Sequence, residues 1–518
     1  MDPVDFMPAS RPMVPDVRSC EAWLARASLG DSGAACVSFL ELLDGLEDTP
    51  PRARAYYDIL ERVRPPLLAA LGQQARRFSA RALPLLPAEQ SAFRQASDLW
   101  LSLLRAWQRL QQAPELIASR KSLSLRALEA AAGLVSVQLV ARRNVEPGAW
   151  SWLHQCYAHA ERHHFAEAEL GDPSGAEAAP GPSCLALYAE VLLLNLANPC
   201  ALSVKELGWV QRWARRWAGK VELWRSAENG GGLAVNLEGG SGPEWMAAGV
   251  PGALRFIECS EVGRSIRRRQ KRLAQGADPV ELGLGRDCVR PGVDELLATL
   301  SRHWSDQPHH RRFPRRATES PVELAAGMQA VFHAIAGAPF ERPSGNEIWG
   351  YSRRAADEIH IFQRAIEHEK RSQGSSPIEN WTAVDESANG FQLVRQGAGV
   401  RLSHRQLVAL RPRGATRFIL CEVCWLKEPS VGTLAVGARA LPGIAQPAAA
   451  RSARNEPWMP CFLLPVADGL PPMLVIGPGL HHPGRPMELK VEGRVQAIRL
   501  GAARGHGADF DWLDFSAA

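Results

Sequence analysis

The sequence predicts an α+β multidomain protein in which an all-α region comes first and a small β-barrel or sandwich comes last. Three observations predict this fold class. Apolar residues recur at spacings of three and four from residue 20 to about residue 218. From about residue 376 to the C-terminus, short β-like runs alternate with Gly and Pro turns. The length of 518 residues suits two to four domains.

The helical spacing is clearest in "SAFRQASDLWLSLLRAWQRLQQ" and in "RARAYYDILERVRPPLLAALGQQARRF", where a Pro-Pro step is expected to interrupt the helix. The run "WSWLHQCYAHAERHHFAEAEL" places Trp150, Leu153 and Tyr157 at the spacing of the first helix of a tetratricopeptide repeat. A second copy is not found about 34 residues away. We therefore expect an array of tetratricopeptide-like helical hairpins, without a regular repeat.

Three regions are predicted from these changes in pattern. Residues 1–218 form the helical, repeat-like interaction region. Residues 219–305 form a mixed α/β connecting region, with strand-like "KVELW" and "LAVNLEG" before the basic helix "GRSIRRRQKRLAQG". Residues 306–518 form the barrel domain, which carries a helical insertion at about 328–375.

The composition is that of an ordinary soluble protein, with 46% hydrophobic and 22% charged residues and a net charge of +5. The N-terminal segment has no apolar core of a secretory signal, and the most apolar stretches are about half as long as a membrane span. The ten cysteines are scattered, mostly within apolar runs, as buried thiols are in a reducing compartment. We expect a cytoplasmic protein that does not span a membrane.

The sequence contains neither a phosphate loop nor the motifs of zinc proteases, α/β-hydrolases or dinucleotide-binding folds. We therefore expect neither an enzyme nor a bound cofactor. The run "RRRQKRL" at 267–273 is interpreted as a solvated helix surface. The alternative is a patch for a partner or an anionic ligand, and RNA binding through this helix is a third hypothesis for the whole chain.

Two groups of residues have side chains that can bind metals. His159 and His163 lie one helical turn apart and could hold a metal, but packed or solvated histidines are the simpler interpretation. Cys421 and Cys424 form a CxxC within a β-like run, where residues three apart face opposite sides. We expect no metal site.

An arginine cluster, "HHRRFPRR", occupies residues 309–316. Pro314 disfavours helix, so the cluster is expected to be an extended, exposed arm. Such an arm spreads Arg311 and Arg315 over roughly 13 Å. Guanidinium groups pair with phosphates, fork onto guanine and stack on purine faces. The arm therefore suits a planar ligand with several negative charges.

A polar patch inside "ENWTAVDESANGFQLV" offers complementary groups. Asp385 can accept the N–H donors of the guanine Watson–Crick edge, and Ser387 lies on the same face of the strand. Gly390, which follows Asn389, allows a positive φ and a close approach of the backbone. By itself the run predicts a hairpin with an Asn-Gly turn. Together with the arm it predicts a site for a guanine nucleotide that carries phosphates.

These two motifs resemble the bipartite signature of PilZ domains, which are bacterial receptors for cyclic di-GMP. Arg311-xxx-Arg315 resembles the first half, Arg312-xxx-Arg316 has the same spacing, and Asp385-x-Ser387-xx-Gly390 resembles the second half. The run "RFILCEVCWLKEPSVGTLAVGARAL" is similar to the central hairpin of the family. The resemblance covers about 306–441, and the helical region resembles that of long bacterial proteins with a C-terminal PilZ-like domain.

The resemblance implies a cyclic di-GMP-binding effector. Its ligand residues would be Arg311, Arg312, Arg315, Arg316, Asp385, Ser387 and Gly390, with the nucleotide bound as a stacked dimer. The helical region would contact an unidentified protein partner, and nucleic acid is not expected as a ligand. The first strand of the barrel is placed at 321–326, before the helical insertion. The alternative is a PilZ-like adaptor or scaffold that works without the nucleotide, because some PilZ-like domains do not bind it.

Overall fold

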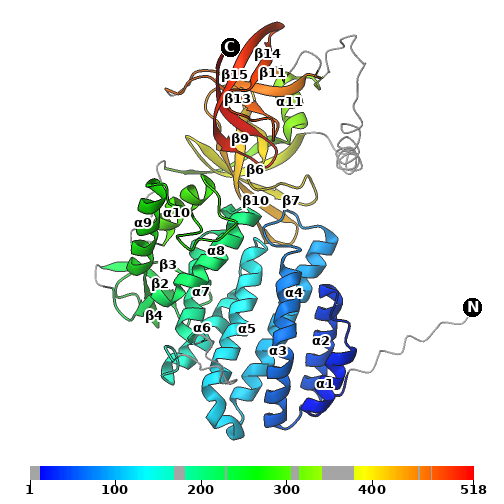
Figure 1. Cartoon of the computed structure of the whole chain (residues 1–518), viewed down its shortest axis with the longest axis vertical. Coiled ribbons are helices and arrows are strands. Elements are labelled where there is room, and N and C mark those ends of the chain that lie inside the picture. Colours follow the sequence, from blue (N-terminus) through cyan, green and yellow to red (C-terminus); the bar gives the residue numbers. More distant parts are fainter. Residues whose placement is uncertain are drawn as a thin grey trace, which may run out of the picture. The chain divides into compact units, whose positions relative to one another are not determined.

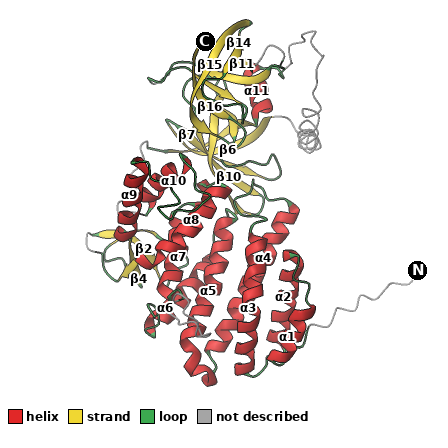
Figure 2. Cartoon of the chain, viewed as in Figure 1, coloured by secondary structure: helices red, strands yellow, loops and turns green. Residues whose placement is uncertain are grey.

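The computed structural model describes residues 12–168, 181–227, 230–304, 314–340, 378–452, 456–467 and 469–518. The chain divides into two compact units. The helical unit comprises Met1–Arg81 and Leu85–His310, and the barrel unit comprises Ala82–Pro84 and Arg311–Ala518. Helices dominate the first and strands dominate the second (Figures 1 and 2). The predicted α+β class, with helices first and antiparallel strands last, is confirmed.

Among the described residues, eight α-helices of the helical unit precede its sheet, and 3-10 turns connect α4 to α5 and α7 to α8. They are α1 (Val17–Arg26), α2 (Ser32–Asp48), α3 (Ala53–Ala75), α4 (Pro87–Gln111), α5 (Arg120–Val140), α6 (Pro147–Arg162), α7 (Cys184–Leu196) and α8 (Val204–Trp217). Helix α4 packs against α5, and α5 packs against α6 and α7 (Figure 1). The tetratricopeptide-like character of this array stays a prediction.

Helix α3 runs unbroken through Pro65 and Pro66, so the expected interruption there is wrong. Each proline removes a backbone donor from the helix. The buried side chains of Val63 and Leu67, on either side of the prolines, hold this part of the helix against the core. Tertiary packing therefore outweighs the local preference.

One helical stretch in the described part of the chain, Pro114–Val140, is long and apolar enough to cross a membrane. Of its most apolar window, 78% is buried inside the protein. A helix in the centre of a protein core can have the same length and apolar composition as a membrane-spanning helix. Its burial here identifies the stretch as a core helix of the helical unit.

The residues after α8 form a four-stranded sheet and two helices within the helical unit. The strands are β1 (Glu222–Trp224), β2 (Gly231–Asn236), β3 (Glu244–Ala247) and β4 (Leu254–Glu258), in the order β1-β4-β2-β3. The helices are α9 (Ser260–Ala274) and α10 (Gly292–His303). Buried Ile257 and Trp304 belong to the same hydrophobic core as α1 to α8. The division at 218/219 and 305/306 stays a prediction.

The barrel unit begins with a closed antiparallel barrel of six strands, called the first barrel here. Its strands are β5 (Arg316–Ala326), β6 (Ile378–Ser387), β7 (Gly390–Gln396), β8 (Leu407–Pro412), β9 (Ile419–Ser430) and β10 (Thr433–Ala440), in the order β10-β7-β6-β5-β8-β9. Helix α11 (Met328–Ala336) follows β5 and begins the predicted insertion. The remainder of that insertion, from 341 to 377, lies outside the described residues.

A second closed barrel follows, so the single barrel predicted for 306–518 is wrong in number. Its strands are β11 (Gln446–Arg451), β12 (Met459–Leu464), β13 (Met473–Ile476), β14 (Pro486–Val491), β15 (Arg494–His506) and β16 (Asp511–Ala517), in the order β11-β12-β13-β16-β15-β14. When the six strands of each barrel are numbered along the chain, the two barrels have the same set of strand pairings. The second barrel is therefore a topological copy of the first.

The two barrels share one hydrophobic core. Helix α11 contributes Val331 and Phe332 to it, the first barrel contributes Leu407, and the second barrel contributes Phe462 and Phe510. The second barrel has a further apolar core of its own, which includes Leu474 and Leu489. The barrels are thus parts of one folded unit.

Three residues from the α3–α4 connection belong to the barrel unit. Leu83 and Leu402 exchange two backbone hydrogen bonds, of 2.9 and 2.8 Å between nitrogen and oxygen. Arg401 also donates to the carbonyl oxygen of Ala82 at 2.9 Å. Both leucine side chains are fully buried. Residues far apart in the sequence therefore complete this unit.

Candidate nucleotide-binding site

The hairpin of β6 and β7 positions the second predicted motif. Ser387 pairs directly with Gly390, so the turn consists of Ala388 and Asn389. The predicted Asn-Gly turn is therefore wrong by one residue. Gly390 is not among the described glycines with a positive φ, so conformational freedom does not explain it. A Cβ atom at Gly390 would lie 2.5 Å from the carbonyl oxygen of Ala438, and this close approach requires glycine.

The arginine arm is described only from Pro314 onward, and Arg311 and Arg312 lie outside the described residues. Arg315 directly precedes β5, and Arg316 is the first residue of that strand. The first strand therefore begins five residues before its predicted start at 321. Its longer N-terminal part pairs Arg316 with Glu386 and Ala317 with Asp385 across to β6.

The described arm residues make ion pairs with the second motif. A guanidinium nitrogen of Arg315 donates to a carboxylate oxygen of Asp385, and these side chains are only 28% and 20% exposed. Arg316 lies 2.9 Å from a carboxylate oxygen of Glu386, but its side chain is 80% exposed. The structure thus places Arg315 beside Asp385. Arg316 pairs instead with a residue outside the predicted set.

A row of residues crosses the first barrel beside this ion pair. Ser387, Gly390, Arg439 and Glu422 are successive direct partners on β6, β7, β10 and β9. Direct partners in adjacent strands lie on the same face of a sheet, and Asp385 shares that face because it lies two residues before Ser387. Ser387 also donates a hydrogen bond of 3.3 Å to the carbonyl oxygen of Gly390. Asp385, Ser387 and Arg439 therefore lie on one face of the sheet.

Glu422 is a buried carboxylate that holds two arginines, and the sequence interpretation missed this group. Its carboxylate accepts from Arg405 at 3.2 Å and from Arg439 at 2.6 Å. Burial by itself lowers the pKa of Arg439, but Cys424 and Glu422 outweigh it, so the pKa rises. Arg439 remains 54% exposed and charged. The available signal was a glutamate within the apolar run "CEVC", because a buried charge needs a partner.

The structure describes the surroundings of Cys421, His159 and His163, the residues with side chains that can bind metals. Cys421 is fully buried, and burial raises the pKa of its thiol, so the thiol stays protonated. His159 and His163 lie with ring centroids 4.5 Å apart. Among the described residues, no group of three histidine, cysteine, aspartate or glutamate side chains is placed to hold a metal ion.

Comparison with known families bears on the helical unit. Residues 18–226 match the family described as "Cyclic-di-GMP receptor FimW, N-terminal domain". The segment similar to the FimW N-terminal domain covers α1 to α8 and most of the region predicted as helical. It ends before both barrels, so the similarity concerns the helical part of a receptor family and not a PilZ motif. No curated protein matches the chain.

Proposed function

We propose that the chain is an effector that binds cyclic di-GMP on the first barrel. One observation carries the proposal: Arg315 lies against Asp385, on the face that also holds Ser387 and Arg439. These side chains come from the ends of β6 and β10 and from the arm, and they supply the donors and acceptors that a guanine nucleotide needs. The similarity of residues 18–226 to the N-terminal domain of a cyclic-di-GMP receptor supports the same ligand.

Binding exchanges partners within the site. Asp385 pairs with Arg315 in the structure, which keeps both charges satisfied. The nucleotide offers phosphates and a guanine acceptor edge to Arg315, while the N–H donors of its Watson–Crick edge replace the guanidinium at Asp385. Arg311, Arg312 and Arg316 add charge from the arm, which suits two stacked nucleotides.

The Ser387–Gly390–Arg439 row forms the remainder of the site. Glycine at 390 places no side chain between the Ser387 hydroxyl and the Arg439 guanidinium, and the carbonyl group of Ala438 approaches its backbone closely. Glu422 holds Arg439 in place through a hydrogen bond of 2.6 Å. The guanidinium keeps free N–H groups for a phosphate. We therefore add Arg439 to the proposed ligand residues.

The nucleotide acts as a signal and is not a substrate. The arm lies where the chain passes from the helical unit to the barrel unit, at the His310–Arg311 boundary. A ligand bound by the arm restrains that connection, and a helical unit that binds a protein partner can respond to the restraint. We propose cytoplasmic action, without a membrane span, a cofactor or a metal, and without nucleic acid as a ligand.

The test is calorimetric titration of cyclic di-GMP into the full chain and into an Asp385→Ala, Ser387→Ala double variant. We expect saturable binding to the natural chain and a loss of about 2–4 kcal/mol in the double variant, from two hydrogen-bonding groups that contact a charged or polar ligand. Glu456→Ala is the control, because Glu456 is exposed just before β12 and belongs to neither motif.

An absence of heat with the natural, folded chain would overturn the proposal. The runner-up is an adaptor that uses its helical unit without the nucleotide. The internal Arg315–Asp385 pair favours it, because the two side chains already satisfy each other. Partner binding that is the same with and without cyclic di-GMP, in a chain that binds no nucleotide, would support the adaptor.

A further inference from the structure

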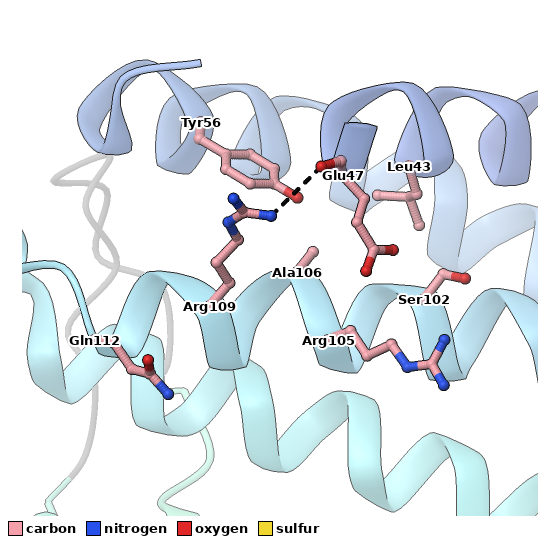
Figure 3. A pocket seen from close by; sticks show the side chains of 8 residues that line it. All are labelled: Leu43, Glu47, Tyr56, Ser102, Arg105, Ala106, Arg109 and Gln112. Carbon is pink, nitrogen blue, oxygen red and sulfur yellow. Dashed lines mark hydrogen bonds between the residues drawn. The ribbon is translucent and has the colours of Figure 1, made fainter. Parts of the chain in front are cut away.

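A cavity of about 300 Å³ lies between helices α2, α3 and α4 of the helical unit (Figure 3). Its volume is at the lower end of the range for small-molecule sites. It belongs to neither of the predicted motifs, and it lies within the segment that matches the FimW N-terminal domain. Its walls are formed by Leu43, Glu47, Tyr56, Ser102, Arg105, Ala106, Arg109 and Gln112.

One end of the cavity offers hydrogen-bond donors. Tyr56 is only 2% exposed, yet its hydroxyl lines the cavity and has no hydrogen-bond partner among the described residues. Burial raises the pKa of Tyr56 to about 12, so the hydroxyl is protonated and can donate. Arg109 extends toward Tyr56 and uses one nitrogen for a long bond of 3.4 Å to the carbonyl oxygen of Glu47 (Figure 3). Its remaining N–H groups can serve a ligand.

The other end offers an acceptor. The carboxylate of Glu47 lies away from Arg109, toward Ser102 (Figure 3), and it makes no ion pair within the described part of the chain. Leu43 and Ala106 supply apolar surface. The cavity therefore opens to solvent between exposed charged residues, with Arg109 at the Tyr56 end and both Glu47 and Arg105 at the Ser102 end (Figure 3), and it has apolar surface beside them.

The charge balance selects the class of ligand. Arg105, Arg109 and Glu47 together carry one net positive charge, which suits one carboxylate better than a doubly charged phosphate. The Glu47 carboxylate also repels a ligand that carries only negative charge. A ligand with one carboxylate and one ammonium group satisfies both ends.

We propose that this cavity binds a free α-amino acid with an aliphatic side chain such as that of leucine. Arg109 and Tyr56 hold the carboxylate, Glu47 holds the ammonium group, and Leu43 and Ala106 contact the side chain. This is a second ligand site, independent of the proposed nucleotide site, and it would let the helical unit sense a metabolite. The same chemical groups also occur at the two ends of a peptide, which carry only one of the two charges each.

The experiment is calorimetric titration of the full chain with three probes. L-Leucine carries both charges, N-acetyl-L-leucine keeps only the carboxylate, as a peptide C-terminus does, and L-leucinamide keeps only the ammonium group. We expect saturable binding of L-leucine and at least about tenfold weaker binding of each blocked probe, because a lost hydrogen-bonded charge costs about a factor of ten or more. Equal affinity for either blocked probe would assign the cavity to a peptide end and overturn the proposal, as would an absence of leucine binding.

Single substitutions assign the two ends. Arg109→Gln is expected to weaken L-leucine binding about tenfold, and Tyr56→Phe, which keeps the ring, by a factor of about three to ten. Glu47→Gln is expected to abolish the preference for L-leucine over N-acetyl-L-leucine. Arg94→Gln, on the same helix but outside the cavity, is the matched control and should leave affinity unchanged. Equal losses in Arg94→Gln and Arg109→Gln would place the binding elsewhere and overturn the proposal.

Discussion

Gly390 lies so close to Ala438 that a Cβ atom on Gly390 would be 2.5 Å from the Ala438 carbonyl oxygen. The backbone of β10 occupies the space that a side chain at position 390 of β7 would need. The glycine of the second motif is therefore a packing requirement of the barrel before it is a ligand contact. A substitution here must displace a strand, because a carbonyl group fixed in the sheet cannot rotate away.

Gly390→Ala is expected to destabilise the barrel unit by about 1–3 kcal/mol, the usual cost of inserting a methyl group into a packed region. Chemical denaturation of the full chain, followed by the circular dichroism of its strands, measures this change. Gly72→Ala is the control, because Gly72 lies in α3 with open space around its Cβ position and alanine favours the helix. Equal stability of the natural chain and Gly390→Ala would contradict the close approach.

The arginine motif can consist of Arg311 and Arg315 or of Arg312 and Arg316, and these two registers differ in the binding energy expected from their second arginine. Arg315 is largely covered and reaches Asp385, whereas Arg316 is 80% exposed and reaches Glu386. Arg315→Ala should therefore weaken cyclic di-GMP binding by about 1–3 kcal/mol, and Arg316→Ala by less than about 1 kcal/mol. Calorimetry of both variants decides the register. A larger loss in Arg316→Ala would favour the pairing of Arg312 with Arg316.

The fold class was predictable because apolar spacing differs between the two halves of the chain, and this spacing follows directly from helix and strand geometry. The number of barrels was not. The strands that the structure describes in this unit can close as one sheet or as two, and closure depends on long-range pairs such as Met473 with Asp514. Such pairs leave no local signal. The unbroken helix at Pro65 was not predictable for the same reason, because tertiary packing of α3 determines it.

The candidate site was predictable where residue type and alternation determined it. Asp385 and Ser387 share a face because they lie two residues apart on a strand. Their neighbour Arg439 was not predictable, because its place beside Gly390 depends on the register of β7 with β10. Register is a tertiary property that the sequence alone specifies only weakly. The turn was misplaced by one residue because the close approach to Ala438, and not the turn, requires the glycine.

Leu83 should stabilise the barrel unit although it lies between α3 and α4 in the sequence. Its side chain is fully buried, and its carbonyl oxygen accepts from the amide of Leu402 at 2.8 Å. Leu83→Ala is expected to cost about 2–5 kcal/mol. Leu86→Ala, at a residue that is 46% exposed, should change stability by no more than about 0.5 kcal/mol.

Hydrogen exchange gives a local measurement of the same relationship. In the full chain the Leu402 amide should be protected, and a chain that begins at residue 306 should lose this protection because it lacks the acceptor. Protection of that amide in the shortened chain would show that residues 82–84 are dispensable for the barrel unit.

His154 should make the stability of the helical unit depend on pH. The ring is fully buried: its Nε2 lies 2.9 Å from the carbonyl oxygen of Ser241, which can only accept, and its Nδ1 lies 2.7 Å from the hydroxyl of Tyr188. The ring is therefore neutral, with Nε2 donating and Nδ1 accepting. Burial lowers the pKa of His154, and the bond to Ser241 opposes this only in part.

The direction of the effect follows from proton linkage. In the unfolded chain His154 takes up a proton at its ordinary pKa of about 6.5. In the folded chain its pKa is lower, so the ring is protonated only at a lower pH. Between these two values the unfolded state binds more protons, so the free energy of unfolding falls as the pH falls. Urea denaturation from about pH 7.5 to about pH 5 should show this loss, above the range in which carboxylates titrate.

Two variants separate His154 from the other groups. His154→Gln should be less stable at neutral pH, because it leaves buried partners unsatisfied, but it should lack the part of the pH dependence that His154 contributes and keep only that of His159, whose pKa burial also lowers. His164→Asn should retain the full dependence, since His164 is exposed and has a φ of 59°, which asparagine tolerates. A pH dependence that persists unchanged in His154→Gln would assign the effect to another group and contradict the buried, neutral ring.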